Sequence, residues 1–510
     1  MPYQHGVRVQ EKDTSLVAPI RGTAGLQVVF GTAPINLAED PTAVTNTPVI
    51  CYSWSEAVKK LGYSAEQSAN GRFLYTLCEA MYASFKLFAV APVIFINVLD
   101  PATHKKVNEA QIVDVESLEA VVPLTGILKS SVTVSKYVPG TGGGDPTITP
   151  LTADTDYTLS FDDHGKLVVT LLSTGAGASA TKVQVTSTSI DPTAVTAADI
   201  VGSTSGATEK GLEVLRQIYP KFGMTPGLIL APGWSHNPTV GLALAAKCEE
   251  INGYFSCECF IDIDSTTSGC TAYSDVKTAK EAAGCVSKHA MALWPCIAAG
   301  DLKFWFSSIM GALTAHTDAE NDDVPNLSPS NYLLGATAVV LADAVYTTDG
   351  NGGGTWDKEV LLDQLQANAV NGTGVTTAFN SNGIRCWGNN SAIYPASTDP
   401  KDRWFCCRRF FSWWGNSFML TYAQKVDKPA NRRLIESIID AENIRGNAYV
   451  ADEKCAAAYI EFIEEENPVT NLIDGKLVFH QHLAPYVPAE DILNTLEFDP
   501  DALRSALNGG

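Results

Sequence analysis

The spacing of hydrophobic residues differs from one stretch of the chain to another. In residues 26–100 and 207–374, compact apolar runs of strand length alternate with segments whose apolar residues recur every three or four positions. The run at residues 93–99 is almost uninterrupted, which is typical of a strand that helices cover on both faces. Ser53 or Ser55 is expected to cap one helix that Gly62 closes, and Asn237 with Pro238 to begin another. Together the two stretches predict one α/β middle domain.

Residues 101–206 interrupt this domain. They are rich in Thr, Ser, Val and Gly and show little helical period. Two alternating arms at residues 157–161 and 166–171 flank an Asp-Asp-His-Gly turn, which predicts a β-hairpin. We therefore expect an inserted all-β domain of the sandwich type. Further along the middle domain, a helix is expected to begin at Pro329 and to continue to Ala344.

Residues 375–490 predict a separate α+β domain. It contains the densest aromatic run of the chain, at 404–414, followed by two segments with helical apolar stripes. The first stripe ends before Gly446, and the second covers residues 449–466. Residues 476–485 then alternate as a strand does, and Pro488 is expected to open a short helix.

The last segment, residues 491–510, ends the chain with another strand pattern. Leu496 and Phe498 alternate with Glu497 and Asp499. An apolar-polar strand so close to the end of a long chain needs a sheet to join, in this chain or in a neighbour. Residues 1–25 open the chain with a similarly short candidate strand around Val7, which the pattern alone leaves open as either a frayed end or an arm.

Composition narrows the class of protein. With 45% hydrophobic and 18% charged residues, the 510-residue chain is typical of a globular protein of about three domains. The formal net charge of −21 disfavours direct contact with nucleic acid or anionic membranes. No apolar run is long enough to span a bilayer, and the first residues do not form a signal peptide, so we expect folding in a cytoplasm. The 12 cysteines lack Cys-x-x-Cys spacing and are expected to be buried free thiols.

Several residues could carry chemistry, but they lack the neighbours that it requires. Ser235 follows an expected strand, where active-site loops of α/β enzymes lie, yet its surroundings are not a Gly-x-Ser-x-Gly elbow. Asp262 and Asp264 end a strand, where a solvated strand end is favoured over a cation site. His480 and His482 share one face of a strand without a third ligand beside them. With no phosphate-binding glycine loop either, the sequence predicts no catalytic, cofactor-binding or metal site.

An acidic cluster closes the second expected helix of the 375–490 domain. A helix C-terminus disfavours acidic side chains, so the cluster carries a cost there. Solvent exposure is one explanation, and a charged contact with a partner is the other. The residues concerned are Glu461, Glu464, Glu465 and Glu466.

Both ends of the chain resemble one protein family. The start "HGVRVQEKD", the next strand "LQVVFGTAP" and the ending "KLVFHQHLAPYVPAEDILNTLEFDP" occur in the order found in the tail sheath proteins of contractile phage tails and related injection machines. Trp404, Phe405, Arg408 and Arg409 match the inner domain of that family, although the adjacent pair Cys406-Cys407 departs from it.

The resemblance implies a structural protein and not an enzyme. Six copies would form each ring of a helical sleeve around an inner tail tube, and contraction would drive the tube through the target envelope. Baseplate and tail terminator proteins are the further partners implied, with assembly in the bacterial cytoplasm and a final place in a virion or tail-like particle. The inserted domain would face outward, and the α+β domain would rest on the tube and be completed by strands exchanged between subunits.

The exchanged strands implied by the resemblance lie in the N-terminal arm, residues 1–25, and the C-terminal arm, residues 491–510. The acidic cluster is the candidate contact with the tube or a neighbouring subunit. The implied inter-subunit residues are His5, Gly6, Val7, Arg8, Val9, Leu496, Glu497, Phe498 and Asp499.

Two other functions stay open on the residues alone. One is an α/β hydrolase acting at the loops of Ser235 or Asp262, with the β domain as an accessory. The other is a carbohydrate- or surface-binding protein that uses residues 101–206. Neither explains why both ends carry strand patterns that match one family.

Overall fold

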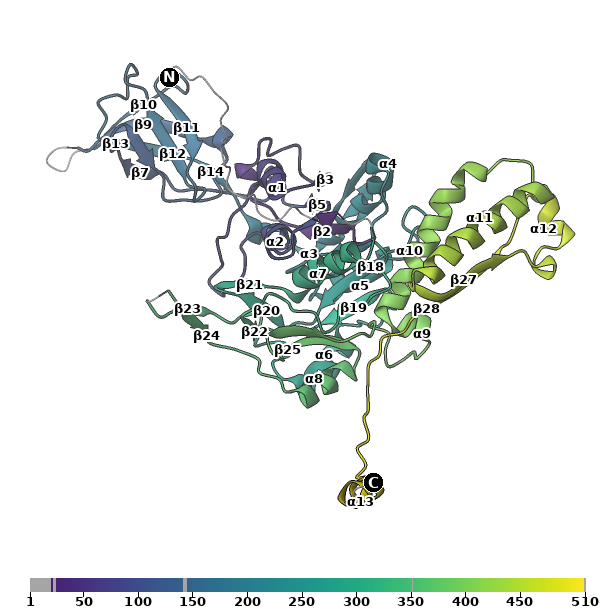
Figure 1. Cartoon of the computed structure of the whole chain (residues 1–510). Helices are drawn as coiled ribbons and strands as arrows, with labels where there is room; N and C mark the ends of the chain where they lie inside the picture. Colours follow the sequence, from purple (N-terminus) through teal and green to yellow (C-terminus); the bar gives the residue numbers. More distant parts are fainter. Residues whose placement is uncertain (1–19, 22–23, 141–144, 351, 509–510) are drawn as a thin grey trace, which may run out of the picture.

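The computed structural model describes residues 20–21, 24–140, 145–350 and 352–508. The chain is a mixed α/β protein of several parts, as the sequence predicts. A central body carries a β-rich part at one end and, at another, two long helices with a small sheet (Figure 1). Within the described residues, no helix combines the length and the apolar character that crossing a membrane requires.

An eight-stranded sheet forms the core of the body, in the order β26-β25-β19-β18-β17-β2-β5-β3. The six inner strands are parallel, and the two edge strands pair antiparallel. The inner strands are almost wholly buried, as expected for parallel strands beneath helices. The bounds of all eight strands are β2 (Gln27–Gly31), β3 (Pro48–Cys51), β5 (Val93–Asn97), β17 (Leu228–Leu230), β18 (Glu258–Asp262), β19 (Ala290–Leu293), β25 (Val375–Asn380) and β26 (Ile384–Trp387).

Two helices begin at residues that the sequence marks as caps. Ser53 accepts a hydrogen bond from the backbone of Glu56 at the start of α1 (Trp54–Leu61), and Gly62 ends that helix. Asn237 caps α5 (Pro238–Lys247) in the same way. The other helices of the body are α2 (Thr76–Tyr82), α3 (Ala197–Val201), α4 (Ile218–Phe222), α6 (Val276–Ala282), α7 (Phe306–Glu320) and α8 (Gln364–Asn371).

Residues 111–186, within the segment between β5 and β17, fold into two small sheets. The predicted hairpin is confirmed, because β11 (Tyr157–Phe161) and β12 (Leu167–Leu171) pair antiparallel. Val134 and Val183 of one sheet share a core with Leu167 and Val169 of the other, which is the packing of a sandwich. The sheets are β10 (Thr147–Pro150), β9 (Thr133–Val138), β13 (Lys182–Thr186), β7 (Gln111–Asp114) and, separately, β11, β12, β8 (Glu119–Val121).

Short strands complete the body and its junctions. β1 (Ile20–Arg21) pairs with β4 (Val90–Ala91), and β6 (Lys105–Val107) pairs with β14 (Thr188–Ile190) at the base of the inserted segment. The others are β15 (Ser203–Ser205), β16 (Thr208–Lys210), β20 (Cys296–Ala299), β21 (Leu302–Phe304), β22 (Ala338–Val340), β23 (Tyr346–Thr348) and β24 (Gly354–Trp356).

The helix expected from Pro329 to Ala344 is wrong. The structure has the strand β22 there, paired with β20, so tertiary pairing decides a stretch whose apolar spacing also suits a helix. Conversely, α7 was not expected. Nearly all of its side chains are buried, so it lacks the amphipathic period that reveals a surface helix.

The C-terminal part contains α9 (Pro400–Arg403), α10 (Phe405–Tyr422), α11 (Arg432–Ala451), β27 (Cys455–Glu461), α12 (Val469–Ile473), β28 (His480–Pro485) and α13 (Pro500–Leu507). The helix expected at residues 449–466 is wrong, since α11 continues past Gly446 and β27 follows it. Gly446 faces β27, where an added Cβ would collide with the carbonyl oxygen of Ala458, so this glycine allows close packing and does not end a helix. The central sheet itself extends to β26, past the boundary expected at residue 375.

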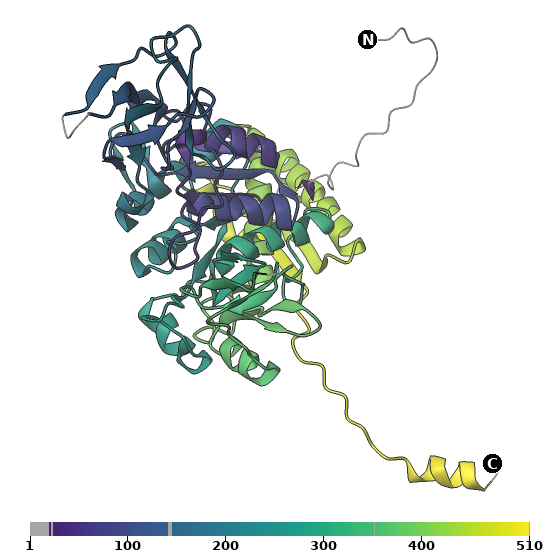
Figure 2. The same ribbon diagram turned by 90° about the vertical axis from the view of Figure 1, so that its left-hand side faces the viewer.

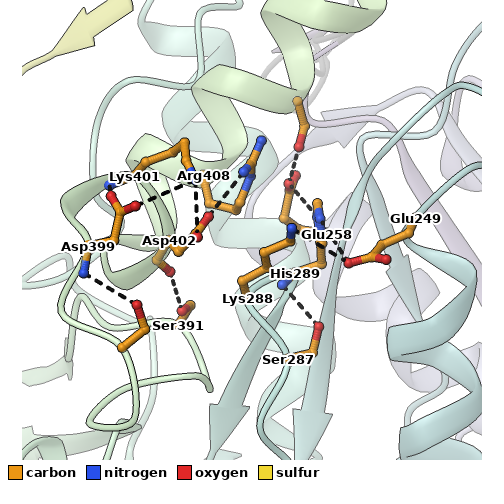
Figure 3. Close-up of polar contacts among 12 residues, drawn as sticks. Glu249, Glu258, Ser287, Lys288, His289, Ser391, Asp399, Lys401, Asp402 and Arg408 are labelled. Atoms are coloured by element: carbon orange, nitrogen blue, oxygen red, sulfur yellow. Dashed lines mark hydrogen bonds and ion pairs between the residues drawn. The ribbon is translucent and has the colours of Figure 1, made fainter.

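Buried polar contacts fasten α10 to the body. Arg409 is 2% exposed and forms a two-pronged ion pair with Asp318 of α7, with 2.9 Å between Nη1 and Oδ1. Ser412 donates a hydrogen bond to Glu258 of β18 at 2.6 Å. Figure 3 shows two more polar contacts at this junction: Glu258 lies beside His289, and Arg408 of α10 lies beside Asp402. These contacts therefore fix the orientation of α10 against the central sheet, and with it that of α11, β27 and β28.

We expect Asp318→Asn to destabilise the fold by about 3–5 kcal/mol, because the charge of Arg409 would stay buried without its partner. Asp322→Asn is the matched control, since the side chain of Asp322 is exposed and pairs with Lys454 at the surface. Urea unfolding of both variants measures the difference. Equal stabilities would show that the ion pair does not hold α10 in place.

Candidate assembly interface

The strands β27 and β28 form a sheet of only two strands. Helix α11 packs along β27, and Asn443 of that helix bonds both the N–H and the C=O of Ile460, at 2.8 and 3.1 Å. The backbone of Ile460 therefore points away from β28, and so does that of Gln481 opposite it in the antiparallel register. The outer edge of β27 is covered at this point by α11, whereas among the described residues the backbone of Gln481 at the outer edge of β28 finds no hydrogen-bond partner.

Gln481 lies at this edge. Its side-chain nitrogen donates to the carbonyl of Tyr459 at 3.1 Å. Its side-chain oxygen is buried and, within the described residues, accepts no hydrogen bond. A buried acceptor without a donor costs about 1–3 kcal/mol. Neither Asn443 nor Gln481 was singled out from sequence, because only the fold places them at a sheet edge.

The acidic residues lie beside the two histidines of β28. Glu461 contacts His482 and Glu466 contacts His480, each at 3.0 Å, and the two imidazole rings stack with centroids 4.6 Å apart. The expected place at a helix C-terminus is wrong: Glu461 ends a strand, and Glu464–Glu466 form a short 3₁₀ turn, so no helix dipole opposes them. Within the described residues, no group of three possible ligands has the geometry of a metal site.

The C-terminal segment leaves the body and ends in α13 (Figure 2). Leu496 is 88% and Phe498 is 74% exposed, and residues 486–499 form neither helix nor strand. The strand expected at Leu496, Glu497, Phe498 and Asp499 is thus not formed in the single chain, where no sheet edge meets it. The helix expected at Pro488 is also wrong, since Asp499 instead caps the later helix α13.

Arg403 holds the beginning of this segment. Its guanidinium contacts the carboxylate of Glu490 at 2.8 Å, so the free part of the segment begins after residue 490. The residues expected in the N-terminal strand, His5, Gly6, Val7, Arg8 and Val9, lie outside the described residues.

Ser235 and Asp262, the residues considered for enzyme chemistry, are buried inside the central body. Ser235 is 1% exposed and donates to Asp262 at 2.8 Å, and the backbone N–H of Ser307 donates to the same carboxylate at 2.9 Å. Burial raises the pKa of Asp262 to about 6, although its hydrogen bonds to Ser307 and Ser235 lower it. A serine that donates to a buried carboxylate has no imidazole base, so this arrangement does not favour a nucleophile.

The comparisons with known proteins agree with the resemblance of the two ends. The tail sheath protein of Burkholderia phage BcepMu is 26% identical over 525 residues, covering 100% of this chain and 99% of that protein. The tail sheath protein of Escherichia phage P2 is 26% identical over 314 residues, covering 59% of this chain and 70% of the other. No family model matches the chain.

Two solved structures show the same fold. A chain of the anti-feeding prophage baseplate superposes with a TM-score of 0.56, at 14% identity, and covers 98% of this chain and 100% of its own length. A chain of the sheath complex of an extracellular contractile injection system, PVC, in its contracted state gives a TM-score of 0.55, also at 14% identity, with 98% and 99% covered.

His236, next to Ser235, gives a pH-dependent prediction. Its ring stacks on Trp305 at 4.5 Å, and burial lowers its pKa from 6.5 to about 4, although the charge of Asp264 raises it. The unfolded chain therefore binds this proton more readily, and stability is lost as the pH falls from 6.5 through 4. We expect His236→Phe, which keeps the stacking, to reduce this loss in urea unfolding at pH 7.5 and 4.5. His164→Gln, at an exposed position, is the control and should leave the acid sensitivity unchanged.

Proposed function

We propose that this chain is a contractile tail sheath protein, of which six copies form each ring of a helical sleeve around an inner tail tube. Contraction of the sleeve drives the tube through a target envelope. The protein acts through assembly and not as an enzyme, in contact with baseplate and terminator proteins. It assembles in a bacterial cytoplasm and ends in a virion or tail-like particle.

The observation that carries this proposal is the match between an open edge and an unpartnered segment. The outer edge of β28 offers backbone groups around Gln481, and the C-terminal segment offers alternating apolar residues that find no sheet in their own chain. Adding an extended segment to a sheet edge joins two proteins through main-chain hydrogen bonds. We propose that Leu496–Asp499 of one subunit pairs with β28 of a neighbour, and that the N-terminal arm around His5 to Val9 makes a second such link.

Such links suit a sleeve that changes length. Residues 491–495 connect the body to the proposed exchanged strand without helix or strand, so backbone rotation there can absorb a large movement between bodies while the paired strands stay bonded. The body that moves is rigid where α10 meets the central sheet through Arg409 and Ser412.

The competing functions account for less of the chain. A hydrolase would need an accessible nucleophile, whereas Ser235 is buried against Asp262. A surface-binding function confined to residues 101–206 does not explain a similarity that extends along the whole chain.

Removing residues 491–510 is expected to abolish sleeves and stacked rings in negative-stain electron microscopy, while leaving a folded monomer by circular dichroism. The physical reason is that the body keeps all of its own contacts but loses the strand that completes a neighbour. Removing only residues 509–510 is the control. Sleeves that form equally well without the whole segment would contradict strand exchange.

Neutralising Glu464 and Glu465 tests the proposed contact with the tube. Both side chains are exposed, whereas Glu461 and Glu466 already contact histidines. We expect Glu464→Gln with Glu465→Gln to reduce co-sedimentation with the tube protein without changing stability. The control, Glu109→Gln with Glu116→Gln, makes the same change of charge at exposed positions of the inserted segment. Unchanged co-sedimentation would remove these two residues from the contact.

A further inference from the structure

A groove of about 660 Å³ lies between the end of α10, the start of α11 and the extended residues that precede β28. Its lining combines apolar side chains with two lysines, Lys425 and Lys428, and Asp427. A volume of this size accommodates several apolar side chains. The apolar side chains that line it are Phe418, Tyr422, Leu434, Ile438, Leu477 and Phe479.

Helix α13 has one apolar face, and among the described residues nothing buries it. Leu503, Ala506 and Leu507 share one face, since they are three and four residues apart, while Ser505 lies on the opposite face. Leu503 is 49% and Leu507 is 76% exposed. The helix stands away from the body at the end of the C-terminal segment (Figure 2).

The charges of the two elements are opposite. The connection from α10 to α11 and the first turn of α11 carry four basic residues, Lys425, Lys428, Arg432 and Arg433, in a chain whose net charge is −21. The segment that leads into α13 carries Asp491, Glu497, Asp499 and Asp501, and no basic residue precedes Arg504. Charges arranged in this way orient two partners as they meet.

We propose that the groove of one subunit binds α13 of a second copy of this chain, with Leu503 and Leu507 against its apolar side chains and Asp499 near Lys425 and Lys428. This rests on the proposed sheath function and extends it, because strand pairing alone assigns no role to α13. The groove reaches Phe479, the residue before β28, and α13 begins directly after the exchanged strand. Strand and helix would therefore occupy one continuous surface.

The helix is already formed before it docks. Asp499 accepts hydrogen bonds from the backbone N–H groups of Asp501 and Ala502, at 3.0 and 2.9 Å, and so caps the first turn. A preformed helix loses less conformational entropy on binding than a segment that folds on its partner.

Pairwise cysteine cross-linking tests the proposal. All 12 native cysteines are buried, so cysteines introduced at the surface should dominate the reaction. Protein carrying Leu503→Cys is mixed with protein carrying Leu434→Cys, the mixture is assembled into sleeves, and mild oxidation is followed by a non-reducing gel. We expect a disulfide-linked dimer, and loss of that dimer when Ser505→Cys replaces Leu503→Cys. Val426→Cys, at a 68% exposed position of the groove, provides a second partner that cannot disturb folding.

The possible results distinguish the binding of α13 in the groove from the sheath function. Sleeves without the dimer, or with equal dimer from Ser505→Cys, would overturn the groove assignment and leave the sheath function standing. Failure of the unmodified chain to form sleeves or rings would overturn both. An intrachain disulfide in the monomeric double variant Leu434→Cys/Leu503→Cys at high dilution would show that the groove takes its own helix and not that of a second copy.

Discussion

A sheet of two strands leaves backbone hydrogen-bonding groups without partners along both outer edges, and in water such a sheet is at best marginally stable alone. In β27 and β28, helix α11 relieves one edge through Asn443 and covers one face, but the edge at Gln481 stays open. The same chain sends out a segment whose apolar side chains find nothing to pack against. The single chain therefore leaves both an unpaired sheet edge and an unpacked segment.

The rest of the molecule is organised to present this edge in a fixed direction. Arg409 with Asp318, and Ser412 with Glu258, join α10 to the central sheet through desolvated polar contacts. Buried ion pairs add little net stability against an apolar alternative, but they are costly to break one partner at a time, so they hold an orientation well. A moving assembly requires rigid bodies and connections that can bend between them. Here the junction of α10 with the sheet is the rigid part, and the C-terminal segment without helix or strand is the connection.

Charge adds selectivity to this design. The acidic chain gathers Lys425, Lys428, Arg432 and Arg433 at the turn between α10 and α11, while its C-terminal segment is acidic. Like charges discourage random association, and a basic turn facing an acidic segment would favour a particular orientation. The buried joint of Ser235 and Asp262 lies away from this surface chemistry and belongs to the packing of the body.

The sequence by itself determined the features that depend on neighbouring residues. The hairpin at Tyr157–Leu171, the capped helices at Ser53 and Asn237, and the alternation of apolar strands and helices all follow from local spacing and capping. Only the tertiary structure decided that residues 338–340 and 455–461 are strands, that α7 is a helix and that Gly446 is a packing position, because those outcomes depend on partners distant in sequence. The alternation at Leu496 to Asp499 can be read in the sequence, yet these residues pair with no strand in the single chain, since strand pairing needs a second backbone that the sequence cannot locate.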